Sequence, residues 1–169
     1  KYSNRFFDST QRQFIQTMIR KIAMKDQLEQ LIQTYNIILF DAECVLCSAW
    51  ADFMIKHDHD YQFKLASVQS NLGQALLTKY QLPTDHFETM VLLEKGQLYT
   101  ESDAFLRIMQ RLDAPYSILS FGKMIPKVIR NFAYRRIALN RYRLFGKTEQ
   151  CYFVTPETQQ HFLLDDVFA

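Results

Sequence analysis

The hydrophobic pattern along the middle of the chain alternates between two periods. Short runs of consecutive apolar residues, such as ILF at 38–40, are typical of strands buried on both faces. Between these runs apolar residues recur every three or four positions, as at Leu46, Trp50, Phe53 and Met54, which is the spacing of one helix face. The alternation predicts strands at 37–41, 63–68, 89–94 and 97–100, and helices that begin at or inside 44–47, at 71–80 and after Thr100 or Ser102.

The predicted order is β-α-β-α-β-β-α, which indicates an α/β fold. Two strands joined through a helix are expected to pair in parallel. Lys95-Gly96 is a two-residue connection of hairpin type, so the last two strands should pair antiparallel. The sheet is therefore predicted to be mixed.

The two ends of the chain are predicted to be helical. Residues 1–34 form a basic extension in which Phe14, Met18, Ile19 and Ile22 share one helix face, and we expect that face to lie against a main domain at 35–169. After Pro115 the pattern turns helical again, and Gly146 is a natural helix stop. No repeat, low-complexity tract or Pro/Gly-rich linker divides the chain further.

Composition is that of an ordinary folded domain. The chain has 169 residues, of which 48% are hydrophobic, so a sizeable core can form. No apolar run approaches the roughly 20 residues of a membrane-spanning helix, and we expect a soluble, cytoplasmic protein without a transmembrane segment. Three cysteines, two of them close together, do not suggest a structural disulfide framework. The oligomeric state cannot be inferred from the sequence.

Charge is distributed unevenly. The segment from Lys123 to Lys147 carries eight basic residues and no acid, interleaved with aromatic residues, whereas the middle of the chain is acidic. Such a block can indicate nucleic-acid binding, but no recognised binding module accompanies it and the acidic middle would repel phosphate. We therefore do not expect nucleic acid as a partner, and most such runs are solvated helix faces.

The candidate chemistry lies at Cys44 and Cys47, where the first strand gives way to a helix. We expect the Cys44 sulfur to be exposed at the helix N-terminus, where unpaired N–H groups and the helix dipole stabilise a thiolate. Cys47, one turn inside the helix, would then be the resolving thiol that closes a disulfide and releases the partner. A CxxC pair beside a βαβ pattern is typical of thioredoxin-like redox chemistry.

Other interpretations of this region stay open. Cys44 and Cys47 could contribute two zinc ligands, with Cys151 and His161 completing the set, or both could be inert small hydrophobes. Asp41-Ala42-Glu43 also resembles the opening motif of haloacid-dehalogenase-type phosphatases, in which Asp41 would be the nucleophile and Asp165-Asp166 metal-binding acids. That family usually has aspartate where Glu43 stands, and its paired acids lie within the sheet.

A larger set of motifs, spread from about residue 37 to residue 163, resembles the DCC family of predicted thiol-disulfide oxidoreductases. These motifs are Asp41-x-x-Cys44-x-x-Cys47, Val68-Gln69-Ser70, Ser102-x-Ala104, Ile125-Pro126, the stretch YRRIALNRYRLFGK at 134–147, Cys151, and Thr155-Pro156-Glu157. The chain departs from the family pattern in having Ala42 where glycine is common, Asn131 where an acid is common and His161 where arginine is common. There is also no proline just before the strand at Thr89, where thioredoxins carry a cis-proline.

The resemblance implies a thioredoxin-like fold and a thiol-disulfide oxidoreductase, with protein-disulfide reductase activity through Cys44 and Cys47. The partners would be a thiol or disulfide substrate and an unidentified electron donor, with no cofactor and no metal. Asp41 could order the loop or accept a proton from Cys47, and Arg141 or Arg143 could fold back to favour a thiolate. Cys151 could be a third redox thiol or a structural cysteine. The alternative from another class is a thioredoxin-like binding or scaffold protein without turnover.

Overall fold

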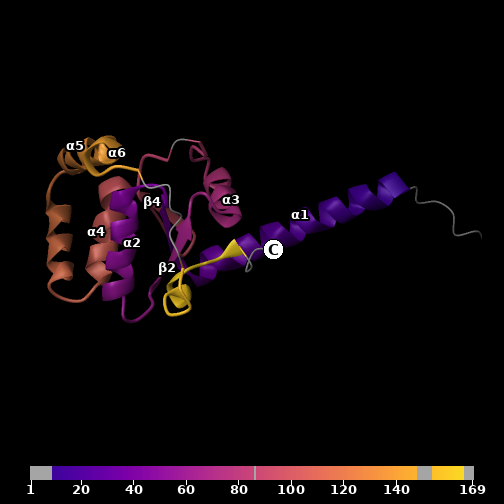
Figure 1. Ribbon diagram of the computed structural model, residues 1–169, viewed down its shortest axis with the longest axis horizontal. Coiled ribbons are helices and arrows are strands. Elements are labelled where there is room, and N and C mark those ends of the chain that lie inside the picture. Colours follow the sequence, from indigo (N-terminus) through magenta and orange to yellow (C-terminus); the bar gives the residue numbers. More distant parts are fainter. Residues whose placement is uncertain (1–8, 86, 148–153, 166–169) are drawn as a thin grey trace, which may run out of the picture.

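A computed structural model describes residues 9–85, 87–147 and 154–165 as a mixed α/β structure (Figure 1). Its elements are α1 Ser9–Thr34, β1 Asn36–Phe40, α2 Val45–His57, β2 Phe63–Ser67, α3 Asn71–Lys79, β3 Val91–Glu94, β4 Gln97–Thr100, α4 Glu101–Arg111, the 3-10 helix η1 Tyr116–Met124, α5 Lys127–Ala138, α6 Arg141–Phe145 and the 3-10 helix η2 Gln159–His161. The predicted β-α-β-α-β-β-α order is confirmed by β1 to α4.

One four-stranded mixed sheet has the strand order β2-β1-β3-β4. β1 pairs parallel with β2, with Ile38 opposite Leu65, and antiparallel with β3, with Ile38 opposite Leu92. β3 and β4 form the predicted hairpin, and both Lys95 and Gly96 have positive φ, at 48° and 77°. Two positive φ values in a two-residue loop match the right-handed twist of the flanking strands.

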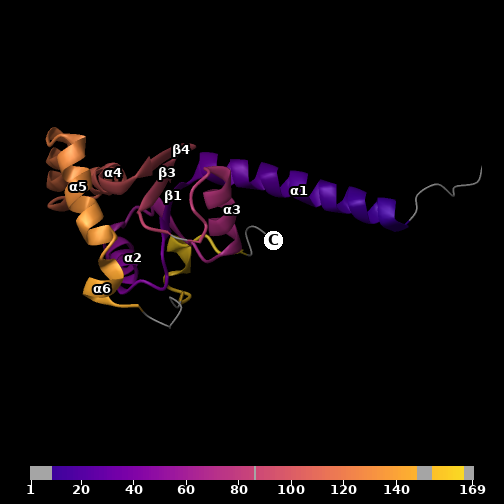
Figure 2. The same ribbon diagram turned by 90° about the horizontal axis from the view of Figure 1, so that it is seen from above.

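The sheet is buried on both faces because successive side chains of β1 point to opposite sides. Ile37 and Leu39 pack in one cluster with α3 and with the C-terminal end of α1. Ile38 and Phe40 pack in a second cluster, with α2 and α4. Each such side chain contributes about 1.5–3 kcal/mol on burial, so the register of the central strand is fixed from both faces. The helices that cover the two faces are separated by the sheet in Figure 2.

The first helix departs from the prediction. Its N-terminal half projects away from the sheet (Figures 1 and 2), and Phe14, Met18, Ile19 and Ile22 are exposed, with Phe14 at 67%. Leu28, Leu31 and Ile32 near its C-terminal end are buried instead. The apolar face at 14–22 was thus wrongly expected to lie against the main domain, because helical spacing identifies an amphipathic face but not what covers it. The division of the chain into 1–34 and 35–169 stays a prediction.

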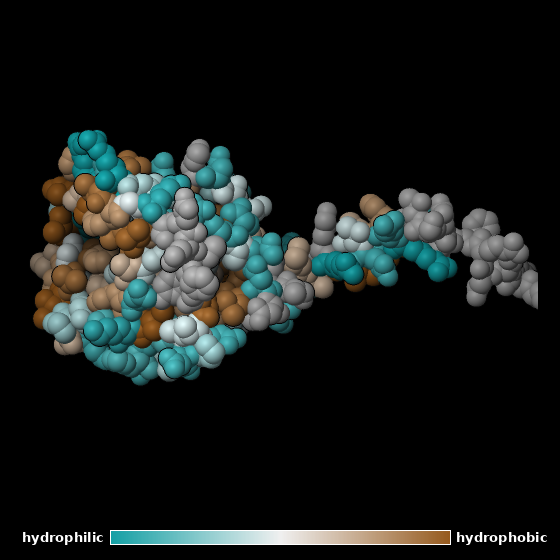
Figure 3. Space-filling view, viewed as in Figure 1, coloured by the Kyte–Doolittle hydropathy of each residue, from teal (hydrophilic) through white to brown (hydrophobic). Residues whose placement is uncertain are grey.

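Ion pairs hold the helical segment after α4 against α4, which itself packs on the sheet. Asp103 of α4 pairs with Lys127 and Arg130 of α5, each at 2.6 Å, and Glu101 pairs with Arg135, also at 2.6 Å. The opposite side of this segment stays apolar and exposed, and it forms the brown surface farthest from α1 in Figure 3. In η1 and α5 the most exposed apolar residues are Ile118, Phe121, Met124, Val128, Ile129 and Phe132.

The last described segment returns to the sheet. The backbone N–H of Leu163 donates to the carbonyl oxygen of Leu65 in β2 at 2.9 Å. Asp165 accepts hydrogen bonds from the backbone N–H groups of Asn71 and Leu72, at 3.2 and 3.1 Å, at the start of α3. Asp165 thus acts as a helix-capping acid, which satisfies otherwise unpaired N–H groups. Within the described helices, none is both long and apolar enough to cross a membrane.

Close packing of α3 on the strand end predicts a strict need for glycine at 73. A Cβ atom at Gly73 would lie 2.0 Å from the carbonyl oxygen of Ser67, which is backbone and cannot rotate away. We expect Gly73→Ala to lower the free energy of unfolding by about 1–3 kcal/mol or more, measured by urea denaturation. Gly122→Ala is the control, because its Cβ would meet the flexible end of Leu106. Equal stabilities of the two variants would contradict this packing.

Candidate active site around the cysteine pair

The cysteine pair lies where β1 ends and α2 begins. Cys44 is the N-cap residue of α2, with extended backbone angles (φ −99°, ψ 120°), and Cys47 lies in the first helical turn. Both are free thiols, and they lie close enough together for Cys44 to raise the pKa of Cys47. The spacing therefore places the two sulfurs together across the first turn, as predicted.

The exposure of the two thiols is the reverse of what we expected. Cys44 is 0% exposed, whereas Cys47 is half-buried. The segment after α6 covers Cys44: Lys147 forms an antiparallel β-bridge with Cys44, and the N–H of Val45 donates to the carbonyl oxygen of Gly146 at 3.5 Å. The prediction of an exposed Cys44 sulfur was wrong because a segment about 100 residues later in the sequence covers that position.

Cys47 is held in the thiol form. Burial raises its pKa, the hydrogen bond and charge interaction with Cys44 raise it further, and Arg141 lowers it only partly, so that the pKa reaches about 12. Burial disfavours the charged form of a thiol because the thiolate loses its hydration. Cys47 therefore stays protonated at neutral pH while the pair is reduced.

Asp41, the first residue after β1, is the centre of a buried polar network. It is 2% exposed. Its Oδ1 accepts hydrogen bonds from Gln69 Nε2 at 2.7 Å and from the backbone N–H of Glu43 at 3.0 Å. Its Oδ2 accepts from Arg141 Nη2 at 3.0 Å and from the Tyr142 hydroxyl. Burial alone would raise the pKa of Asp41, but these four hydrogen bonds outweigh burial and lower it.

Arg141 connects the C-terminal helices to this network. It is 6% exposed, forms an ion pair with Asp41, and also donates to the carbonyl oxygens of Phe87 and Ala138. Burial alone would lower the pKa of Arg141, but the hydrogen bond to Asp41 and the interactions with Tyr142 raise it, so the guanidinium stays charged. The predicted return of an arginine to the cysteine loop is thus found for Arg141. Arg143 is exposed, and Cys151 lies outside the described residues.

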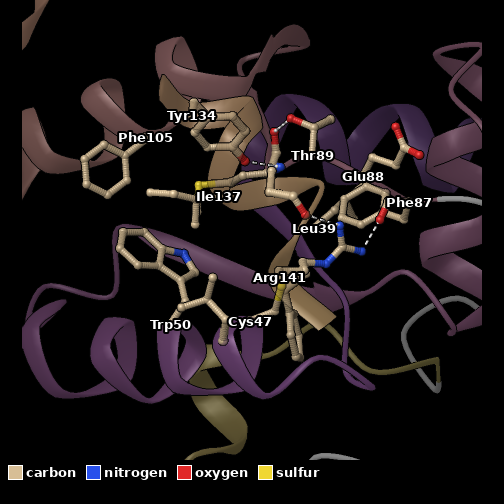
Figure 4. A pocket seen from close by; sticks show the side chains of 14 residues that line it. Leu39, Cys47, Trp50, Phe87, Glu88, Thr89, Phe105, Tyr134, Ile137 and Arg141 are labelled. Atoms are coloured by element: carbon tan, nitrogen blue, oxygen red, sulfur yellow. Dashed lines mark hydrogen bonds between the residues drawn. The ribbon is translucent and has the colours of Figure 1, made fainter. Parts of the chain in front are cut away.

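A mostly apolar pocket of about 300 Å³ opens beside Cys47 (Figure 4). Cys47 and Trp50 of α2 face Tyr134 and Ile137 of α5 across it, and Arg141 lies at one end. The pocket is lined by Leu39, Phe40, Leu46, Cys47, Trp50, Phe87, Glu88, Thr89, Met90, Phe105, Tyr134, Ile137, Ala138 and Arg141.

Two backbone features shape the pocket wall before β3. The N–H of Met90 donates to the Tyr134 hydroxyl at 2.7 Å, and the carbonyl oxygen of Met90 accepts from the N–H of Glu101 at 3.2 Å. Both backbone groups of Met90 are therefore engaged within the chain. A peptide strand pairing with this backbone would first have to displace Tyr134 and Glu101.

The geometry argues against the phosphatase interpretation. A nucleophilic aspartate needs a free carboxylate oxygen, but both oxygens of Asp41 are engaged and one faces the cationic Arg141. Glu43 is exposed and lies 3.7 Å from Lys147, and Asp165 caps α3 instead of joining Asp41. Asp166 lies outside the described residues.

The zinc interpretation finds no third ligand in the described part of the chain. His161 is buried against Tyr61, with ring centroids 4.6 Å apart. Among residues 9–85, 87–147 and 154–165, no group of three His, Cys, Asp or Glu side chains is placed to hold a metal ion. Cys151, the other proposed ligand, lies outside these ranges.

The basic segment at 123–147 is largely paired within the chain. Lys127, Arg130, Arg135, Arg141 and Lys147 each contact an acidic residue. The acids are Asp41, Glu43, Glu101 and Asp103, from the acidic middle of the sequence. The uneven charge along the chain is thus partly neutralised by folding, which leaves less free positive charge for phosphate than the sequence suggests.

Several residues of the site were not predicted. Gln69 and Tyr142 bind Asp41, and Trp50 and Tyr134 line the pocket. Gln69, Tyr134 and Tyr142 stand inside the family-like motifs, so the motifs marked their positions but not their contacts. The sequence identifies Trp50 only as one of the apolar residues on a predicted helix face.

Comparisons with known proteins point to one family. A family model described as DCC1-like thiol-disulfide oxidoreductase matches residues 38–147. The chain is 39% identical over 128 residues to "Uncharacterized protein YuxK" of Bacillus subtilis, which covers 76% of this chain and 93% of that protein. It is 34% identical over 116 residues to "DCC family protein At1g52590, chloroplastic" of Arabidopsis thaliana, which covers 68% of this chain and 67% of that protein. No solved structure matches the chain. A cytoplasmic location stays a prediction.

The buried network predicts that Asp41 is needed for stability. We expect Asp41→Asn to lower the free energy of unfolding by about 3 kcal/mol or more, because it leaves the buried Arg141 charge without its partner. Urea denaturation at pH 7 measures this loss. The difference from the wild type should shrink only as the pH falls below the ordinary aspartate value of 3.8, because the folded-state pKa of Asp41 is lowered.

Glu43→Gln is the matched control for this prediction. Glu43 lies two residues away in the same loop, but its pair with Lys147 is exposed. Such pairs contribute about 0–1 kcal/mol, so this variant should be close to the wild type. A loss as small for Asp41→Asn as for Glu43→Gln would contradict the role given to the network.

Proposed function

Because the chain belongs to the DCC1-like thiol-disulfide oxidoreductase family, we propose that it is an enzyme that exchanges a dithiol for a disulfide through Cys44 and Cys47. The observation that carries the proposal is the close pair of free thiols at the start of α2, with Cys47 in the wall of a pocket. Two thiols this close along the chain can form a disulfide, and the pocket gives a partner molecule access to one of them.

The fold that supports this chemistry is, in our proposal, thioredoxin-like. The β1-α2-β2-α3-β3-β4-α4 order, with β1 central and parallel to β2 and the hairpin antiparallel to it, is consistent with that fold. In this proposal residues 35–169 form the redox domain and residues 1–34 a helical extension. The redox pair then lies at the carboxyl end of a central strand, where ligands commonly bind in α/β sheets.

We assign the first exchange step to Cys47, because it is the sulfur that faces the pocket. Cys47 attacks one sulfur of a partner disulfide as its thiol gives up its proton, the partner S–S bond breaks, and the released half takes up that proton and leaves as a thiol. Cys44 then attacks Cys47, a Cys44–Cys47 disulfide forms, and the second half of the partner leaves as a thiol. The reverse sequence oxidises a partner dithiol. This assignment replaces the expected order, in which Cys44 attacked first.

Asp41 and Arg141 are positioning residues in this proposal. With a lowered pKa and four hydrogen bonds, Asp41 is a poor proton acceptor for Cys47 at neutral pH. Its ion pair with Arg141 holds the α5–α6 segment beside the cysteine loop, and Arg141 in turn moderates the pKa of Cys47. The scaffold alternative uses the same contacts but lacks exchange, so turnover separates the two.

Exchange is tested by the reduction of insulin and of 2-hydroxyethyl disulfide in the presence of dithiothreitol. We expect Cys44→Ser, Cys47→Ser and the double variant to lose activity above background, because each lacks one sulfur of the couple. Cys151→Ser is the matched control and should keep most of the activity. A wild-type rate no higher than that of the double variant, with both disulfides, would contradict the proposal and favour a scaffold.

The raised pKa of Cys47 gives a separate prediction. In a Cys151→Ser background, alkylation of Cys47 by iodoacetamide should accelerate with pH toward a midpoint near 12, as measured by peptide mass spectrometry. Adding Cys44→Ala should move the midpoint down, since it removes a hydrogen bond and a charge interaction that raise this pKa. A midpoint that does not move would show that Cys44 is not in contact with Cys47.

A further inference from the structure

We infer that the pocket beside Cys47 binds a small quinone, which accepts the two electrons of the reduced cysteine pair. This inference rests on the proposed dithiol-disulfide function and names an electron acceptor for it. The pocket is the starting observation. Disulfide formation between Cys44 and Cys47 does not by itself require an apolar pocket beside them.

The size and lining of the pocket fit a flat apolar molecule. Pockets for small ligands measure about 300–1,000 Å³, so a volume of about 300 Å³ suits a molecule of one or two rings. The aromatic rings of Trp50, Phe105, Tyr134 and Phe87 line it, and such rings pack well on a planar partner. Glu88 and Ile137 at the wall are exposed, so the pocket is open to solvent there.

Two buried donors in this apolar wall have no partner in the described part of the chain. They are Nε1 of Trp50 and Nε of Arg141, and both atoms are buried. Arg141 is itself 6% exposed, and in Figure 4 the indole nitrogen lies on the side of Trp50 that faces Cys47. A buried donor without a partner costs about 1–3 kcal/mol. Because both atoms are buried, a ligand oxygen reaches them only when the wall side chains shift, and the hydrogen bond formed then would remove that cost.

Among redox partners of a dithiol, a quinone matches these features best. It combines a planar apolar ring with carbonyl oxygens that accept hydrogen bonds, and it takes up two electrons. A small peptide thiol carries charged groups that would lose their hydration against the apolar wall. A protein strand would meet the backbone of Met90, whose N–H and carbonyl groups are already engaged by Tyr134 and Glu101.

The proposed reaction balances without another reactant. The S–H bonds of Cys44 and Cys47 break and an S–S bond forms between the two sulfurs. Two electrons and two protons pass to the quinone, whose two carbonyl oxygens become hydroxyl groups. The products are the disulfide form of the protein and one hydroquinone.

Binding is tested with duroquinone, whose ring positions are all methylated so that thiols do not add to them readily. The chain has a single tryptophan, Trp50, which lies in the pocket wall, so its fluorescence reports on this site. The Cys44→Ser/Cys47→Ser protein is titrated so that no redox reaction intervenes, with N-acetyltryptophanamide correcting for light absorption. We expect saturable quenching.

Two pocket variants and one control define the site. Ala138→Leu places a larger side chain in the pocket and should weaken binding about tenfold or more, whereas Trp50→Phe removes one donor and should weaken it about fivefold. Trp50→Phe has no tryptophan fluorescence, so its binding is measured by calorimetry. Ala133→Leu makes the same change on the same helix at an exposed position outside the lining and should bind like its parent.

Turnover is tested under argon with the reduced protein and duroquinone. We expect one hydroquinone for each Cys44–Cys47 disulfide formed, at a rate lowered by Ala138→Leu but not by Ala133→Leu. Absence of saturable binding, or equal effects of the two alanine variants, would overturn the quinone inference. If 2-hydroxyethyl disulfide is still reduced, only this inference fails, whereas loss of both reactions from the wild type would overturn the proposed function as well.

Discussion

The buried ion pair between Asp41 and Arg141 determines how the site is built. Asp41 follows the central strand, and Arg141 stands 100 residues later, in the helical segment that lies beside the cysteine loop. A buried charge without its partner is strongly unfavourable, so folding of the loop and docking of the C-terminal helices favour one another. Through this pair the segment at 146–147 comes to lie over Cys44, and α5 comes to form one wall of the pocket.

The same contact explains why the two cysteines have different surroundings. Cys44 lies between the helix start and the covering segment, while Cys47 turns toward the pocket between α2 and α5. Burial and the contact with Cys44 keep Cys47 protonated, and Arg141 opposes this effect in part. The pocket, the covered sulfur and the moderated thiol are therefore consequences of one docking arrangement. Chemistry at the pair is accordingly expected to depend on residues that do not themselves touch a substrate.

The local structure could be predicted from the sequence, because it follows from patterns of short range. The strand at 37–41, the helix at the cysteine pair and the Lys95-Gly96 hairpin all lie where periodicity and turn chemistry placed them. The motif resemblance also identified the family. Spacing along one helix could show that two sulfurs meet, but not which of them faces solvent. That depends on Lys147, a residue from a distant segment.

Contacts between distant segments also explain two other differences between the sequence-based predictions and the structure. The apolar face at 14–22 has the period of a packed helix, yet only the end of that helix near Leu28 and Ile32 reaches the sheet. The basic run at 123–147 suggested a free positive surface, but acids from the middle of the chain neutralise much of it. Periodicity and charge describe a segment by itself. Its neighbours are set by the fold.

The central claim is that Cys44 and Cys47 form one two-electron redox couple. It is tested most directly by equilibrating the protein in dithiothreitol buffers of graded redox potential and then alkylating the free thiols. Mass spectrometry of the peptide that contains both cysteines reports how many thiols remain. The account predicts that both thiols are lost together in a single two-electron transition, with a disulfide inside that peptide. A disulfide that joins either cysteine to Cys151 instead, or two thiols that persist at every oxidising potential, would contradict it.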